Sequence, residues 1–191
     1  MARVCIHTLE PLEHGGVMAK VRVVAEIQRK FGHSVNLLFT ATEQVPVGNR
    51  WDIVRHLSRR VRPYWVTYGD YSGLALPHWP LPIWLTYLLP WAFCRSAYAN
   101  RDVQVVVSGA SHCGMPAALS CKRCVVWIGT LYEDELQAKA LAGDRWASRM
   151  LSGMNGLVLR WEEQFVLERA SIILTNGTHT AARIREVYPN V

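Results

Sequence analysis

The sequence of 191 residues is 50% hydrophobic and 19% charged, which excludes a disordered chain and suits one well-buried domain. Its net charge of +6 predicts attraction to anions without choosing among nucleic acid, phosphorylated ligands and acidic lipids. The densest basic segment, residues 55–62, is short, so we interpret it first as a solvated face. The first apolar run is too short for a signal peptide and the cysteines number five, which predicts a cytoplasmic protein with reduced thiols.

Strands and a helix alternate in the first part of the sequence. The apolar run Arg3–Thr8 predicts a strand, and apolar residues at helical spacing from Val17 predict a helix that ends near Gly32. Residues 34–40 and 64–68 predict two further strands, separated by a polar and irregular region.

The second half repeats this alternation. Val103–Val107 is almost continuously apolar, which is typical of a strand buried on both faces. The remaining predicted elements are a helix over 115–120, a strand over 124–128, a long helix with Met154, Leu157, Val158, Trp161 and Phe165 on one side, a strand over 172–175 and a helix over 178–188. The pattern predicts an α/β fold: a single Rossmann-like, doubly wound domain over residues 1–191, with a mostly parallel sheet and helices on both faces. Ligands of such folds gather beyond the carboxyl ends of the strands.

The pair Gly15 and Gly16 lies between the first strand and the first helix. Without side chains, such a turn lets main-chain N–H groups at the helix N-terminus approach a phosphate. A tight strand-to-helix turn favours glycine even when it binds nothing, so both interpretations stay open. The segment lacks the Gly-x-Gly-x-x-Gly dinucleotide fingerprint and the Walker lysine motif, which argues against a nicotinamide or flavin enzyme.

From Tyr71 to Cys94 there is no aspartate, glutamate, lysine or arginine. Four prolines interrupt this stretch, so it does not predict a membrane-spanning helix. One interpretation is a core helix near residues 83–89. The other is an aromatic surface, with Trp79, Trp84 and Trp91, that contacts a bilayer interface or a lipid-linked acceptor.

Polar side chains follow the predicted strands that end near residues 107 and 128. His112 follows the first, and Thr130, Tyr132 and Glu133 follow the second. Together with His14, they are candidates to contact an acceptor or transfer a proton; the acidic residues could equally favour a helix N-terminus. The motif Cys121-Lys122-Arg123-Cys124 is compatible with a metal or redox site. A second pair of ligands is missing, so we expect buried thiols and no metal or cofactor.

Four segments, in this order and spacing, resemble the amino-terminal domain of retaining GT-B glycosyltransferases of group 1, also called family 4. They are Glu13–Val17, Lys30–Val35, Ser108–Ala118 and Glu168–Asn176, and the likeness extends over essentially the whole chain. One departure is Trp127-Ile128-Gly129-Thr130, where many relatives carry a histidine.

The resemblance implies the acceptor-side half of a two-domain enzyme that moves a sugar from a nucleotide-sugar donor to a hydroxyl acceptor, such as a glycan or lipid-linked molecule. Gly15 and Gly16 would then contact the donor phosphates. The nucleotide-sugar domain would lie beyond Val191, so this chain alone is expected to be inactive. We expect no nucleic-acid partner, and contact with the inner face of the membrane as an additional feature. The alternatives are a non-catalytic Rossmann-like binding module and a peripheral membrane-binding protein.

Overall fold

A computed structural model describes residues 1–9, 15–44, 63–68, 70–78, 85–88, 100–120 and 124–191. Its strands are β1 (Arg3–Leu9), β2 (Ser34–Gln44), β3 (Tyr64–Tyr68), β4 (Tyr71–His78), β5 (Val103–Ser108), β6 (Cys124–Ile128) and β7 (Ala170–Thr175). Its helices are α1 (Gly16–Lys30), α4 (Met115–Ser120), α5 (Tyr132–Leu141), α6 (Arg145–Leu151), α7 (Gly153–Arg169) and α8 (Thr178–Val187), with a short 3-10 helix, η1 (Ser111–Gly114).

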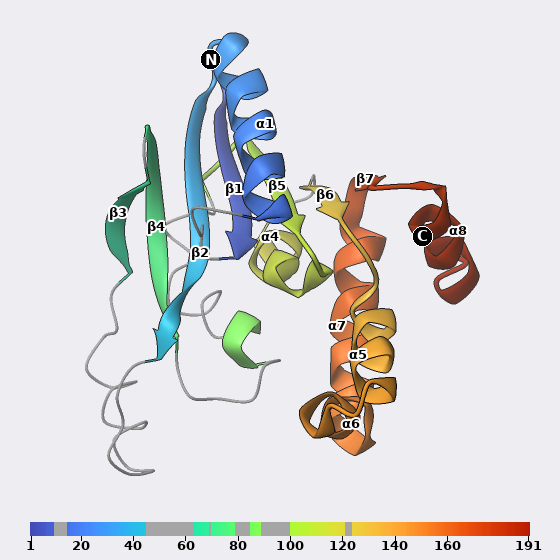
Figure 1. The fold of residues 1–191 in the computed structure, drawn as a ribbon. Helices are drawn as coiled ribbons and strands as arrows, with labels where there is room; N and C mark the ends of the chain where they lie inside the picture. Colours follow the sequence, from blue (N-terminus) through green and yellow to red (C-terminus); the bar gives the residue numbers. More distant parts are fainter. Residues whose placement is uncertain (10–14, 45–62, 69, 79–84, 89–99, 121–123) are drawn as a thin grey trace.

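Within the described residues, the strands form one sheet in the order β3-β4-β2-β1-β5-β6-β7 (Figure 1). All neighbouring pairs are parallel except β3 and β4, which are antiparallel. Strand order reverses beside β1, whose neighbours are β2 and β5. The predicted Rossmann-like, mostly parallel sheet is therefore confirmed, and its topological switch point lies at the carboxyl end of β1.

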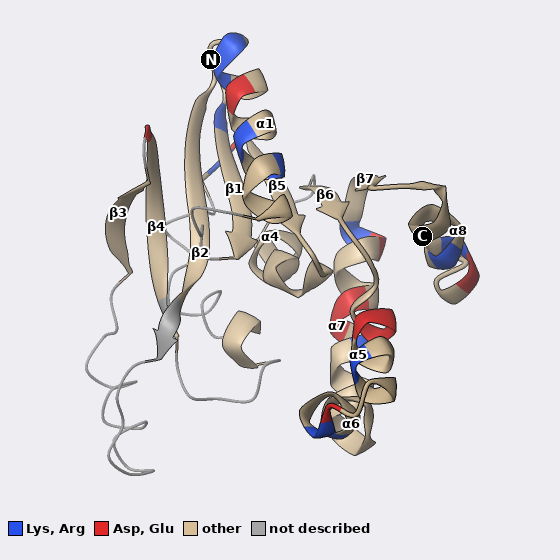
Figure 2. Cartoon of the chain, in the orientation of Figure 1, with Lys and Arg blue, Asp and Glu red and all other residues tan. Residues whose placement is uncertain are grey.

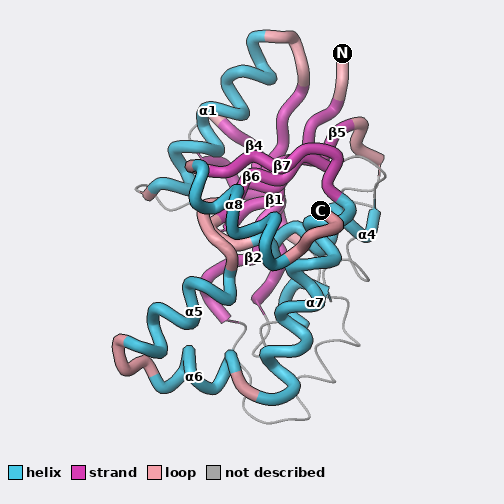
Figure 3. The backbone as a smooth tube through the Cα atoms, turned by 90° about the vertical axis from the view of Figure 1, so that its right-hand side faces the viewer, coloured by secondary structure: helices cyan, strands magenta, loops and turns pink. Residues whose placement is uncertain are grey.

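Helices cover both faces of this sheet (Figure 3). Alternate residues of each central strand point to opposite faces. On one face, Ile6 of β1 and Val105 of β5 pack with Val21 of α1. On the other, Val106 packs with residues of α4, β6 and α7. Because β1 and β5 are buried on both faces, their apolar sequences carry the strongest strand signal.

Strand β4 was not predicted. Its residues belong to the uncharged stretch 71–94, and they include Gly73 and Pro77, which weaken a strand signal. Gly73 is required by packing, because a Cβ there would lie 2.8 Å from Cε1 of Phe39 in β2. The core helix expected near 83–89 is present as a helical segment at 85–88, where Tyr87 and Leu88 pack against the core.

Between β6 and β7 the chain forms a helical protrusion, α5–α6–α7, that extends away from the sheet (Figures 1 and 3). Ala147 of α6 is buried with Leu136 of α5 and Leu159 of α7, which fixes these three helices together. Among the described residues, no helix is both long and apolar enough to cross a membrane.

Candidate functional site

The N-terminus of α1 opens the site at the carboxyl edge of the sheet. Gly15 has φ +141°, a conformation that side-chain-bearing residues rarely adopt. A Cβ at Gly16 would meet no described atom within 4 Å. The first N–H groups of a helix lack helical acceptors, so, with respect to the described residues, the backbone here is open to an anion. The phosphate contact of Gly15 and Gly16 stays a prediction.

Lys20, one turn further along α1, was not singled out by sequence reasoning. Its Nζ lies 5.6 Å from the centre of the Trp127 ring, close enough for a cation–π contact. Burial lowers the pKa of this ammonium group. Among the described residues it has no carboxylate within ion-pair distance, so its charge remains available to an anion. Helical spacing from Gly16 was the signal that could have found it.

Hydrogen bonds connect the loops that follow β5 and β6, which lie next to Lys20 at this edge of the sheet. The N–H groups of Gly129 and Thr130 both donate to the carbonyl of Gly109, each at 3.2 Å. Thr180 Oγ1 donates to the carbonyl of Gly129 at 3.1 Å. The ends of β5 and β6 and the start of α8 are thereby tied together.

Trp127 and Asn176 are two further side chains near Lys20 and Gly129. Trp127 Nε1 donates to Asn176 Oδ1 at 3.2 Å. A Cβ at Gly129 would lie 3.3 Å from Asn176 Nδ2 and 3.6 Å from Lys20 Nζ. A side chain at position 129 would therefore crowd both groups, which is a physical reason for glycine here in place of a larger residue.

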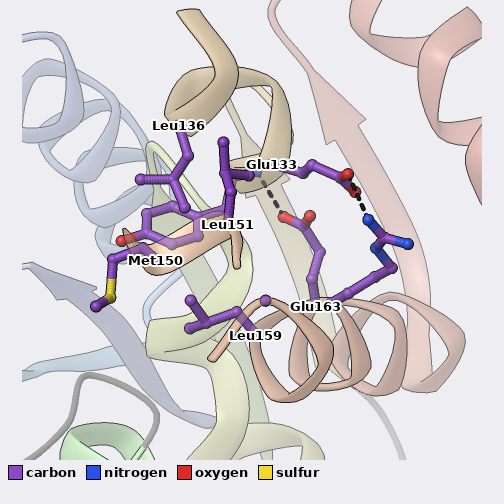
Figure 4. Close-up of a pocket in the computed structure, with 9 residues that line it drawn as sticks. Glu133, Leu136, Met150, Leu151, Leu159 and Glu163 are labelled. Carbon is purple, nitrogen blue, oxygen red and sulfur yellow. Dashed lines mark hydrogen bonds and ion pairs between the residues drawn. The ribbon is translucent and has the colours of Figure 1, made fainter. Parts of the chain in front are cut away.

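The predicted residues Tyr132 and Glu133 lie at the start of α5 and face α7. Glu133 Oε1 forms an ion pair with Arg160 Nη2 at 2.5 Å, and the Tyr132 N–H donates to Glu163 Oε1 at 2.9 Å (Figure 4). The cavity between these helices is about 20 Å³, room for a single water molecule. It is too small for a sugar.

His112 is buried, 3% exposed. Its Nε2 donates to the carbonyl of Leu159 at 3.0 Å, and its ring stacks edge-on against Tyr132 at 4.6 Å between centroids. Burial lowers the pKa of His112 to about 4, so the imidazole is neutral at physiological pH. In this arrangement it attaches η1 to α7, and its role toward an acceptor stays a prediction.

Two adjacent glutamates of α7 point into the protein interior. Glu163 accepts hydrogen bonds from the Tyr132 N–H, from Ser111 Oγ at 3.3 Å and from the Tyr188 hydroxyl at 3.3 Å. Burial nevertheless raises the pKa of its carboxyl to about 7. Glu162 is also buried, and within the described part of the chain neither of its carboxylate oxygens has a hydrogen-bond partner. Burial raises the pKa of Glu162 to about 8.

Several predicted site residues cannot be placed. His14, Trp79, Trp84 and Trp91 lie outside the described residues, as does Cys121. Cys124 is buried. Over the described ranges, no three histidine, cysteine or acidic side chains gather as metal ligands would.

Solved structures share this fold. An alpha-glucosyltransferase in complex with UDP-glucose and DNA containing an abasic site superposes with a TM-score of 0.51 and 14% identity, covering 100% of this chain and 40% of that chain. An alpha-glucosyltransferase in complex with UDP gives a TM-score of 0.49 at 14% identity, with the same coverage of 100% and 40%. No protein-family profile matches the sequence, and no curated protein does.

The first of these likenesses defines the class of fold: a Rossmann-like domain of the kind found in GT-B glycosyltransferases that use a nucleotide sugar. This chain spans 40% of the length of that neighbour. At 14% identity the likeness establishes the fold alone.

The expectation that nucleic acid is not a partner is corrected by the same comparison. The alpha-glucosyltransferase was solved with DNA bound, so this fold is compatible with nucleic acid. The expectation rested on the shortness of the basic segment 55–62. Phosphate contacts need no such run, because a fold gathers cations that are scattered in the sequence.

Proposed function

We propose that this chain is the acceptor-side, amino-terminal domain of a glycosyltransferase that moves a sugar from a nucleotide-sugar donor to a hydroxyl acceptor. The observation that carries the proposal is the meeting of Gly15, Gly16 and Lys20 at the carboxyl edge of the sheet, beside the ends of β5 and β6. The fold shared with a UDP-glucose complex supports it.

The chemistry of the donor explains why these groups suit it. A nucleotide sugar carries a diphosphate, whose leaving-group charge grows as the sugar departs. Backbone N–H groups, the positive end of α1 and an ammonium group all stabilise that charge. In this proposal a second α/β domain supplies the contacts to base and ribose. The acceptor is a hydroxyl-bearing molecule, and DNA joins glycans and lipid-linked molecules as a class to test, because the neighbour's complex contains it.

Replacement of Gly16 by valine tests the proposal in a polypeptide that also carries the proposed second domain. We expect turnover to fall about tenfold, because the isopropyl group blocks approach to the helix N-terminus. The fold should stay intact, because a Cβ at position 16 meets no atom of the described residues within 4 Å. Release of UDP from UDP-glucose, measured with a panel of acceptors, checks this. Gly16→Ala, which adds only one methyl group, is the conservative control. Transfer by residues 1–191 alone, or unchanged turnover in Gly16→Val, would contradict the proposal.

Lys20→Met should separately weaken use of the donor. The substitution removes the charge but keeps an unbranched apolar stem against Trp127, so we expect kcat/KM for the donor to fall about tenfold. Lys30→Met, at the exposed opposite end of α1, is the matched control. Equal losses of kcat/KM in the two variants would show that net charge causes the loss, and Lys20 would not belong to the site.

A further inference from the structure

Helix α7 is apolar on two sides, because Leu159, Val166 and Leu167 are buried in the core and a second set of apolar residues is exposed. Its buried residues include Glu162 and Glu163, whereas Met154, Leu157 and Trp161 are 71%, 65% and 51% exposed. These three residues follow the i, i+3, i+7 spacing of one helix face. A continuous exposed apolar stripe of this kind marks a surface that another body covers.

Helix α6 extends this surface with positive charge. Its inner residue Ala147 is buried, while Arg145 and Arg149 are exposed and lie one turn apart. Neither arginine has an ion-pair partner in the part of the chain that the structure describes. Trp146 beside them is 46% exposed. Figure 2 shows this basic colour on α6, at the far end of the protrusion.

The charge balance of the surface is positive. From residue 141 to residue 161 the sequence holds three arginines and one acidic residue, Asp144. The Asp144 carboxylate is occupied as the N-cap of α6, where it accepts from the N–H of Trp146 at 2.8 Å. Arg160 is occupied by Glu133. Because a hydrogen-bonded carboxylate keeps its charge, Arg145, Arg149 and Asp144 together leave a net charge of +1 on α6, the helix that directly precedes α7 in the chain.

We propose that the outer face of α6 and α7 is a docking surface for an anionic lipid bilayer. The surface is defined by Arg145, Trp146 and Arg149 of α6 and by Met154, Leu157 and Trp161 of α7. Unpaired arginines beside tryptophan, methionine and leucine are the composition of segments that lie in a membrane interface, with cations at the headgroups and apolar side chains below them. The chain's net charge of +6 adds long-range attraction. This proposal does not depend on the glycosyltransferase assignment.

Co-sedimentation of the chain with vesicles tests this surface. We expect binding to vesicles of phosphatidylcholine with about one third phosphatidylglycerol, weak binding to phosphatidylcholine alone, and loss of binding as salt shortens the Debye length. Arg145→Glu with Arg149→Glu should reduce the partition coefficient about tenfold or more, given roughly 1 kcal/mol for each cation at an anionic surface. Met154→Gln with Leu157→Gln should reduce it about tenfold at every salt concentration.

Matched control variants carry comparable substitutions outside the proposed surface. Arg22→Glu with Lys30→Glu makes the same change in charge on exposed residues of α1, and Phe31→Gln removes an apolar side chain that is 74% exposed. The charge control lowers the long-range attraction as well, so we expect it to lose some binding, but much less than Arg145→Glu with Arg149→Glu. Phe31→Gln should bind as the unmodified chain does. No binding to any vesicle, or equal losses in the α1 controls, would overturn the proposal. So would loss of self-association in Met154→Gln with Leu157→Gln by analytical ultracentrifugation, which would assign the face to a second copy of the chain.

Discussion

Replacing Glu162 with glutamine should stabilise the folded chain by about 2 kcal/mol at pH 8 and by almost nothing at pH 4. Burial raises the pKa of this carboxyl from 4.5 to about 8. Below pH 4.5 both folded and unfolded chains hold the proton, so stability does not change there. Between pH 4.5 and pH 8 the unfolded chain loses the proton and the folded chain keeps it, so stability falls as pH rises, by at most roughly 1.4 kcal/mol per pH unit.

Glutamine has the shape of the protonated carboxyl and does not titrate, so the difference between the two proteins should grow through this same interval. We expect a smaller stability difference than the whole pKa shift would give, because a partly relaxed interior lowers the free-energy cost of the buried charge. Urea denaturation at pH 4, 6 and 8 measures it. Glu168→Gln, at an exposed position of α7, is the control and should change stability little at any pH. A constant difference from pH 4 to pH 8 would show that Glu162 ionises freely in the folded state.

The sequence predicts the frame of this fold well because its central strands are buried on both faces. The expected bounds of the strand over 64–68, the helix over 115–120 and the strand over 124–128 match β3, α4 and β6. Strand β4 was not predicted because Gly73 and Pro77 weaken its sequence pattern. Glycine is needed at position 73 because the Phe39 ring of β2 packs against it. Such a contact joins two strands, and no local pattern reports it.

Helix α7 shows a different limit of periodicity. The spacing of Met154, Leu157 and Trp161 correctly indicates a helix with these residues on one side, but the core lies on the opposite side. Glu163 can face inward because three donors from distant parts of the chain meet it. Spacing within a helix cannot show which face meets those donors.

The candidate site was predictable only in part. Gly15 and Gly16 could be found from their place between a strand and a helix. Lys20 could not be ranked, because its importance comes from Trp127 and Gly129, which are more than 100 positions away in the sequence and adjacent only in the folded sheet. His112 looked available in a loop, but its Nε2 is occupied by Leu159 of α7. Both differences arise from contacts between elements distant in sequence.

Replacing Glu163 with leucine should destabilise the chain by about 3 kcal/mol. The substitution keeps the volume but leaves the Tyr132 N–H, the Ser111 hydroxyl and the Tyr188 hydroxyl without their acceptor, and each buried donor left unsatisfied costs about 1 kcal/mol or more. Glu163→Gln is the matched control: it keeps one oxygen as an acceptor, so the loss should be less than half as large. Urea denaturation at pH 7 measures both, and hydrogen exchange at the Tyr132 amide should quicken in Glu163→Leu more than in Glu163→Gln. Equal stability of the two variants would mean that Glu163 is held by packing alone, and that the junction of η1, α5 and α8 does not depend on its carboxylate.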